Sequence, residues 1–366
     1  MKILYIITST TRGGAENTLF TLLSRVDKMI FQPAGVISLK PRGPVADKIE
    51  ELGIPVTSLD MGYLPSLFDA GRLKREIARL KPDIVHAFLF RAIQYARAAK
   101  KENPFKLIAS PRVNYRTRNP VILFKDRLSR DADDLVICES DSSREFFLTG
   151  QKYDPARVIT IRNGIDSEFW RTDAEARSAM RFKADIADDE LLLFSSGRLD
   201  RQKGYEYLIR ALALVKDKTP RLKTVIAGQG PMREKLGKLV SELKLDRVVR
   251  FAGEQADIKA WLSAADIFAL SSLWEGVPNS LLEAMSAGKP CVATRVDGVC
   301  EVARENTDAL LAAPGDPRSL SEKILKLYEN AGLRRELGGA ARESILENRS
   351  MPDMIAAYEN AYRQLV

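Results

Sequence analysis

Two glutamates near residue 280 are residues whose side chains could do chemistry. Seven residues separate Glu275 from Glu283 in the segment EGVPNSLLE. Glu283 lies within an apolar run, where a carboxylate usually has a partner. A carboxylate accepts hydrogen bonds from two adjacent hydroxyl groups, so either glutamate could bind a sugar diol. The alternative is that Glu275 is an ordinary loop charge and Glu283 an ordinary charge on a helix.

The residues between these glutamates predict the start of a helix. Asn279 and Ser280 are residue types that cap helices, and Gly276 and Pro278 precede them. Unpaired backbone N–H groups at a helix start bind phosphate or sugar hydroxyl groups well. We therefore expect an anion or sugar site that includes Gly276, Asn279 and Ser280.

Two cations follow an apolar run, Leu191–Ser195, that predicts a buried strand. Arg198 and Lys203 lie in the segment GRLDRQKG, which leads into a helical pattern. Arginine offers a planar fork to phosphate, and lysine offers a point charge. The segment is not a Walker A loop. A Walker A loop ends in Gly-Lys followed directly by Ser or Thr, and this segment contains no such sequence. Phosphate binding is one interpretation, and an ordinary solvated loop is the other.

A glycine pair near the N-terminus has two equal interpretations. Gly13 and Gly14 follow the strand expected over Lys2–Ile7 and precede a helical pattern. Glycines let a backbone approach a bound anion, but they also occur in tight turns that need a positive φ. A second glycine pair, Gly228 and Gly230, lacks the third glycine of a dinucleotide-binding loop and is read as a turn.

The single histidine and a short acidic motif complete the candidates. His86 is expected at the carboxyl end of a strand over 84–87, where a structural and a substrate-binding role are both open. Asp131 and Asp133 match the DxD pattern of metal-dependent sugar transferases. They precede the strand expected over 135–138, on the side away from the ligand end of a sheet, so we predict no metal site.

The elements around these residues alternate between strands and helices. Such alternation indicates βαβ units and parallel sheets. Two series of about 150 residues each predict two Rossmann-like domains with a cleft between them. The break falls at Asn163-Gly164, a strong turn signal. We expect domains over 1–164 and 165–348, and a C-terminal helix over 349–366 that packs on the first domain.

The composition excludes several classes of protein. The chain has 366 residues, 57 Lys and Arg against 49 Asp and Glu, three Cys and one His. Three cysteines without CxxC spacing predict neither a disulfide scaffold nor a cysteine zinc site. The apolar stretch after Met1 is too short for a signal peptide, and no run is long enough to span a membrane. We therefore expect a cytoplasmic location.

The motifs together resemble those of glycosyltransferase family 4, retaining sugar transferases of the GT-B fold. The resemblance covers nearly the whole chain, and the order and spacing of the motifs make it specific. The motifs are Gly13-Gly14-Ala15-Glu16, Asp83-Ile84-Val85-His86, Cys138-Glu139-Ser140, Asn163-Gly164-Ile165-Asp166, Gly197-Arg198-Leu199 with Lys203-Gly204, Glu275 to Glu283, and Asp297-Gly298.

The resemblance implies a nucleotide-diphospho-sugar donor, with a UDP-sugar favoured over a GDP-sugar, and no cofactor or metal. Arg198 and Lys203 would neutralise the diphosphate, Glu283 would bind the ribose and Glu275 the donor sugar. Arg198, Lys203 and Glu275 are therefore the expected catalytic residues. In this family, attack on the same face as the departing phosphate retains the anomeric configuration.

Further roles follow from the same resemblance. Gly13 and Gly14 would let the first domain approach the donor phosphates, and amides around Gly276, Asn279 and Ser280 would contact sugar or phosphate. Many relatives carry a histidine where this sequence has Arg112, and a guanidinium cannot act as a base at neutral pH. Arg112 and His86 are thus assigned to the acceptor or donor-sugar side. A different GT-B enzyme, such as a phosphorylase or an epimerase, and a non-catalytic basic binding protein are the alternatives.

The positive charge of the chain is concentrated in one window. Residues 91–130 contain 11 Lys and Arg but only two acidic residues, whereas the whole chain has a net charge of +8. No nucleic-acid-binding motif accompanies this charge. Within the window, Pro120–Phe124 gives a helix an apolar start. It indicates either an anionic membrane surface as a partner, which suits a lipid-linked acceptor, or a solvated helix with Leu123, Phe124 and Leu128 in the core.

Overall fold

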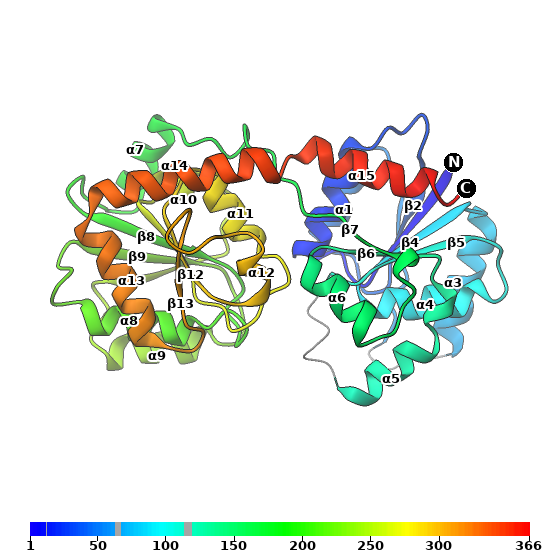
Figure 1. Cartoon of the computed structure of the whole chain (residues 1–366), viewed down its shortest axis with the longest axis horizontal. Helices are drawn as coiled ribbons and strands as arrows, with labels where there is room; N and C mark the ends of the chain where they lie inside the picture. The colour runs from blue at the N-terminus through cyan, green and yellow to red at the C-terminus, as the bar shows by residue number, and fades with distance from the viewer. Residues whose placement is uncertain (12, 63–66, 113–118) are drawn as a thin grey trace. The chain divides into compact units, whose positions relative to one another are not determined.

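A computed structural model describes residues 1–11, 13–62, 67–112 and 119–366. The chain divides into two compact units, of which the first contains 1–164 and 351–366 and the second contains 165–350. Both ends of the chain therefore lie in the first unit (Figure 1). The second unit ends two residues beyond the boundary expected from the sequence.

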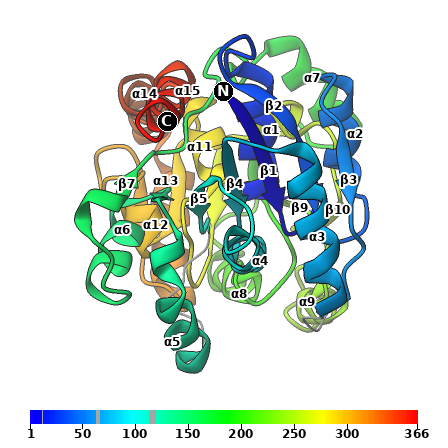
Figure 2. The same cartoon turned by 90° about the vertical axis from the view of Figure 1, so that its right-hand side faces the viewer.

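Within the described residues, the first unit is built on a seven-stranded sheet in which every pairing is parallel. Its order is β3-β2-β1-β4-β5-β6-β7, and Figure 2 shows β1 and β4 at its centre. The strands are β1 (Lys2–Ile7), β2 (Gln32–Ser38), β3 (Val56–Ser58), β4 (Ile84–Phe88), β5 (Lys106–Ser110), β6 (Leu135–Cys138) and β7 (Val158–Thr160).

Helices cover both faces of this sheet, as parallel strands require. They are α1 (Gly14–Arg25), α2 (Pro44–Glu51), α3 (Leu67–Leu80), α4 (Phe90–Lys100), α5 (Pro120–Leu128), α6 (Asp141–Thr149) and α15 (Met351–Arg363), with 3-10 turns η2 (Arg130–Ala132) and η3 (Pro155–Arg157). The last helix packs into the core of the first unit, where Tyr358 and Tyr362 are fully buried beside residues of β1 and α1.

The second unit, which is described in full, has a six-stranded parallel sheet with the order β10-β9-β8-β11-β12-β13. Its strands are β8 (Leu191–Ser196), β9 (Leu222–Ala227), β10 (Val249–Gly253), β11 (Ile267–Leu270), β12 (Cys291–Thr294) and β13 (Leu310–Ala312). Its helices are α7 (Ala174–Lys183), α8 (Tyr205–Val215), α9 (Arg233–Glu242), α10 (Ile258–Ala264), α11 (Asn279–Ser286), α12 (Asp297–Cys300), α13 (Pro317–Glu329) and α14 (Ala331–Asn348).

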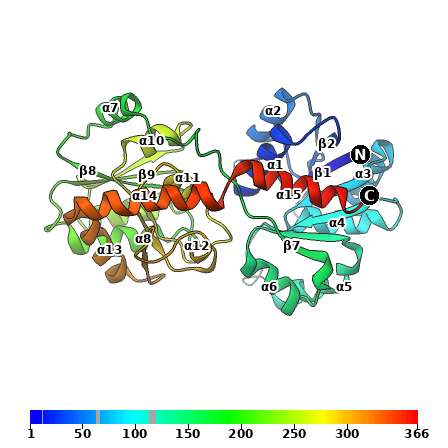
Figure 3. The same ribbon diagram turned by 45° about the horizontal axis from the view of Figure 1, so that its top comes forward.

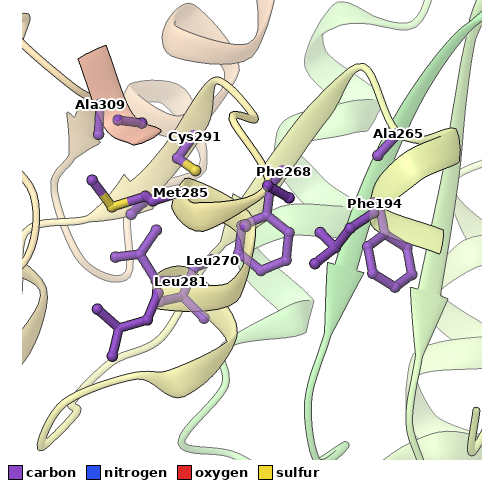
Figure 4. Close-up of a cluster of buried hydrophobic side chains, with 14 of the residues drawn as sticks. Phe194, Ala265, Phe268, Leu270, Leu281, Met285, Cys291 and Ala309 are labelled. Atoms are coloured by element: carbon purple, nitrogen blue, oxygen red, sulfur yellow. The ribbon is translucent and has the colours of Figure 1, made fainter. Parts of the chain in front are cut away.

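Alternate residues of each central strand enter two different cores. Phe194 of β8 lies in the core beneath α10 and α11, whereas its neighbour Leu193 lies in the core beneath α8 and α13. Figure 3 shows α8 and α13 on one side of the sheet and α10 on the other. Leu281 and Met285 of α11 join the first of these cores (Figure 4). These contacts set the rotation of α11 about its axis.

The predicted fold of two Rossmann-like domains with parallel sheets is confirmed. The central strands fall where the sequence indicates, with ends that differ by one or two residues. β4 continues to Phe88, one residue beyond the expected end, so His86 lies in the middle of the strand. Three strands that the sequence reading missed are β3, β7 and β13, each of three residues at a sheet edge.

Candidate active site

The chain changes direction across the sheet of the second unit between β8 and β11. It leaves β8 towards β9 on one side and later returns to β11 on the other. At such a point the loops after the two strands diverge, and ligands of open α/β sheets bind there. The loop after β8 carries Arg198 and Lys203, and the loop after β11 carries Glu275.

Hydrogen bonds join these two loops. The Leu273 amide donates to the carbonyl of Gln202 at 2.7 Å, and the Ser271 hydroxyl donates to the carbonyl of Lys203 at 2.9 Å. Gly204 makes this approach possible, because a Cβ atom there would lie 2.1 Å from the Ser271 carbonyl oxygen, and its φ of 61° is left-handed. The two loops therefore form one structure around Lys203.

Glu275 is buried and held by three side chains. Its Oε1 atom accepts from Lys203 Nζ and from the Ser272 hydroxyl, both at 2.6 Å, and its Oε2 atom lies 3.3 Å from Gln202 Nε2. Gln202 Nε2 also donates to the Trp274 carbonyl at 3.0 Å. These donors hold the Glu275 carboxylate in one position before any ligand binds.

The helix after this loop begins differently from the sequence prediction. Neither Asn279 nor Ser280 caps α11 with its side chain; the capping position is Pro278, and the other two are the first helical residues. The first amide that the helix uses internally is that of Leu281, which donates to the Pro278 carbonyl at 3.0 Å. Amides ahead of it point out of the helix start, towards the position expected for an anion. The expected cap is wrong, but the expected placement of Asn279 and Ser280 at this helix start is right.

Glu283 is a carboxyl group without a protein partner. Helix geometry of 100° per residue turns it away from the core that holds Leu281 and Met285. Burial raises its pKa to about 8, and the nearby Lys203 opposes that rise. Among the described residues it makes no hydrogen bond or ion pair. A desolvated carboxyl group facing a cation is the arrangement expected where a ligand supplies the missing donors.

Arg198 lies further from this cluster. Its side chain is 72% exposed, and its Nε atom is 3.7 Å from a carboxylate oxygen of Asp200. Asp200 also accepts from the Lys203 amide at 3.3 Å. The structure thus brings Lys203, Glu275 and Glu283 together and leaves Arg198 as an extended cation on the same loop.

The first unit has an equivalent change of direction, between β1 and β4. Gly13 and Gly14 open α1 after β1, and Gly13 has an extended φ of −172°, so the positive φ expected of a tight turn is wrong. Glu16 folds back towards this turn, since a Cβ atom on Gly13 would lie 2.4 Å from its Oε2 atom. The Ser9 hydroxyl donates to Glu16 at 2.8 Å, and burial raises the pKa of this carboxyl group.

His86 is enclosed within the first unit. Its Nδ1 atom lies 2.9 Å from the Tyr362 hydroxyl and its Nε2 atom 2.8 Å from the Ser110 hydroxyl. The ring is fully buried, and this burial, with the charge of Arg112, holds its pKa well below the usual value. Because both ring nitrogens are within hydrogen-bond distance of hydroxyl groups, His86 has the geometry of a structural residue that joins β4 to α15. The prediction that it lies at the end of the strand is wrong.

Arg112 lies two residues after the end of β5, with a left-handed φ of 55°. Its guanidinium group donates to the Asn163 side chain and to the Tyr358 hydroxyl, and it lies 5.9 Å from the centre of the Phe88 ring. Its Nε atom is buried and has no hydrogen-bond partner in the described structure. The Tyr358 hydroxyl of the C-terminal helix α15 therefore helps to position Arg112.

Two family models match the chain, one for each unit. Residues 12–169 match the model described as Glycosyltransferase Family 4, and residues 176–344 match the model described as Glycosyl transferases group 1. The chain belongs to glycosyltransferase family 4. The matches support the expected identity of the chain as a glycosyltransferase enzyme.

The glycosyltransferase is similar to bacterial relatives over nearly its whole length. It is 29% identical to the lipopolysaccharide core biosynthesis glycosyltransferase LpsE of Rhizobium meliloti, over 94% of each chain. It is 26% identical to the putative glycosyltransferase EpsF of Bacillus subtilis, over 94% of this chain and 91% of the relative. A solved structure of HepE from Anabaena, in complex with UDP and glucose, has a TM-score of 0.89 at 21% identity over both complete chains.

Three residues that hold the loops of the candidate site together were not predicted from the sequence. Gln202, Ser271 and Ser272 lie beside residues that the motifs single out, but their role depends on which loops meet in the folded glycosyltransferase. The available signal was weak: Ser271 and Ser272 are short polar residues directly after β11, and Gln202 lies within the loop after β8. Loop residues of this kind commonly form hydrogen bonds between loops.

Replacing Gln202 is expected to impair the site without removing a charge. Gln202→Ala should lower the donor kcat/KM about fivefold, because a hydrogen bond to the Glu275 carboxylate and one to a backbone carbonyl are lost. Steady-state kinetics measure the change, and Gln229→Ala, at an exposed position in the neighbouring loop, is the control. Equal kinetics in the two variants would show that Gln202 has no positioning role.

Proposed function

We propose that this glycosyltransferase moves a hexosyl group from a nucleotide-diphospho-sugar to a saccharide or lipid-linked acceptor, with retention and without a metal, in the synthesis of cell-surface glycan or glycolipid. The observation that carries the proposal is the half-buried Glu283 carboxyl group, which faces Lys203 and lacks a protein partner. Ribose hydroxyl groups supply the missing donors, and a diphosphate supplies the anion for Lys203.

The remaining residues of the site fit the same donor. Glu275, held by Lys203, Ser272 and Gln202, accepts hydrogen bonds from hydroxyl groups of the transferred sugar. Amides at the start of α11, from Gly276 to Ser280, bind the sugar or the phosphates. A UDP-sugar is favoured because structures of HepE are complexes with UDP and with UDP-glucose.

The proposed reaction needs no protein nucleophile. The bond between the anomeric carbon and the phosphate oxygen breaks, and its electrons leave with the nucleoside diphosphate. The acceptor hydroxyl oxygen bonds to the anomeric carbon on the same face, and its proton passes to the departing phosphate. Lys203 and Arg198 stabilise the negative charge that develops there, which is the largest contribution such a site makes to the rate.

Activity is expected to survive removal of divalent metals. The fixed cations of the loop after β8 offset the charge of the leaving group, which is the role a metal plays in other transferases. Nucleotide release from UDP-sugars in the presence of an acceptor mixture, measured with excess EDTA, tests this. An activity that EDTA abolishes and that Mg²⁺ or Mn²⁺ restores would contradict the metal-free mechanism.

Donor affinity is expected to rise with pH. The Glu283 carboxyl group, with a pKa of about 8, is mostly neutral at pH 6.5 and mostly ionised at pH 8.5, and only the ionised form offers all its lone pairs to the ribose. Between these pH values the affinity for UDP-glucose should rise about tenfold. Calorimetric titration measures it, and Glu283→Gln should bind weakly and independently of pH. The same pH dependence in Glu283→Gln would place the titrating group elsewhere.

A further inference from the structure

Helix α5 of the first unit presents apolar side chains to solvent. Val121, Phe124 and Leu128 are 61%, 62% and 69% exposed, and Ile122 is also exposed. The spacing of the first three places them on one stripe of the helix. Only Leu123 packs against the core, so the interpretation that Phe124 and Leu128 are core residues is wrong. The helix lies at the outer edge of the first unit (Figure 1, Figure 2).

A buried ion pair holds the helix in this orientation. Asp126, on the opposite side from the stripe, is buried and accepts from Arg97 Nη1 at 2.7 Å and from Gln94 Nε2 at 2.5 Å. Arg97 also donates to the backbone carbonyl of Asp126 at 3.1 Å. The acidic residue therefore faces inward and the apolar residues face outward, which reverses the usual pattern of a surface helix. A rotation of the helix that turned the apolar stripe inward would break the buried ion pair between Arg97 and Asp126, which would be strongly destabilising.

Cations flank the apolar stripe. Lys125 and Arg127 are both exposed, and neither has an acidic partner in the part of the chain that the structure describes. The only acid of the helix, Asp126, is buried and paired with Arg97. Two more bases of the same window, Arg116 and Arg118, lie outside the described residues. Exposed apolar groups between unpaired cations have the chemistry of a helix that lies in an anionic lipid interface.

We infer that α5 docks the enzyme on an anionic membrane surface. A second copy of the chain fits less well, because the flanking cations would repel each other across a two-fold axis. The stripe is also small, since a nine-residue helix is about 14 Å long and a stable interface needs about 800 Å² from each partner. Among the described residues, no helix has the length and apolar character to cross a bilayer. Docking through α5 is separate from donor binding in the second unit.

Co-sedimentation of the full chain with vesicles tests this inference. Wild-type protein should bind vesicles of equal parts phosphatidylglycerol and phosphatidylcholine at low salt, and much less at high salt or on pure phosphatidylcholine. Lys125→Glu should lower binding at least about fivefold, and Phe124→Asp at least about tenfold. Phe182→Asp and Lys183→Glu on α7 are matched controls, since Phe182 is 90% exposed and Lys183 follows it.

The outcomes separate the candidate partners. Loss of binding in both α5 variants but in neither α7 variant supports membrane docking. Absence of vesicle binding, equal binding to neutral and anionic vesicles, or equal losses in the α7 controls would overturn it. So would a wild-type dimer that Phe124→Asp dissociates in sedimentation velocity. An unchanged circular dichroism spectrum and thermal unfolding midpoint in Phe124→Asp show that the variant is folded, and this check does not depend on the proposed donor site.

Discussion

Lys203→Ala is expected to lower the donor kcat/KM about 10- to 100-fold, which corresponds to the loss of about 1.5–3 kcal/mol from a charged hydrogen bond to the leaving phosphate. The variant should remain folded, because Ser272 and Gln202 still donate to the buried Glu275 carboxylate. The rate falls for a second reason, since Glu275 also loses the 2.6 Å contact that positions it. Steady-state kinetics with varied UDP-sugar measure the loss.

A lysine elsewhere in the second unit provides the control. Lys235 on α9 is 72% exposed and lies 3.3 Å from Glu206, so Lys235→Ala should leave donor kinetics unchanged. Unfolding curves of both variants separate a stability defect from a catalytic one. Wild-type turnover by a folded Lys203→Ala protein would remove Lys203 from the site.

Asp133→Ala is expected to destabilise the first unit by about 3–5 kcal/mol, because the buried Arg97 guanidinium loses its main partner. Asp133 accepts from Arg97 Nε at 2.9 Å and Nη2 at 2.7 Å, and from the Tyr153 hydroxyl at 2.8 Å. Urea denaturation followed by circular dichroism measures the change as a lower midpoint for the transition of this unit.

The neighbouring acid of the same motif is a matched control. Asp131 is 89% exposed and makes only a 3.6 Å contact with Arg130, so Asp131→Ala should change stability by less than about 0.5 kcal/mol. Equal destabilisation by the two substitutions would refute the network. The contrast also explains the DxD pattern, in which one acid stabilises the fold and the other is solvated.

The sequence predicted the central strands of both sheets and missed three short strands at the sheet edges. β1 and β6 are apolar runs buried on both faces, and their bounds agree with the prediction. β3, β7 and β13 are three residues long and pair on one side only, so too few residues repeat for a pattern to emerge. Burial of apolar side chains determines the central strands of each sheet, and the short edge strands pair with a sheet that is already formed.

The residues of the candidate site could be predicted from their types and motifs, but the contacts between them could not. The motifs singled out Lys203, Glu275 and Glu283, whereas the sequence could not show that the first two form an ion pair and the third has no partner. Those properties depend on loops that meet only when β8 lies beside β11. The prediction of His86 at a strand end was wrong for a similar reason. Its two hydrogen-bond partners come from β5 and from α15, and the partner on α15 is 276 residues away in the sequence.

Hydrogen exchange measured with and without UDP, in the presence of EDTA, tests the central claim most directly. A donor diphosphate held at the change of direction between β8 and β11 should slow exchange of amides in residues 197–204 and 275–283, the two loops that Lys203 and Glu275 join. Amides of α13 and α14 should exchange at unchanged rates. Protection confined to other segments, or none at saturating UDP, would contradict the assignment of the donor site to these loops.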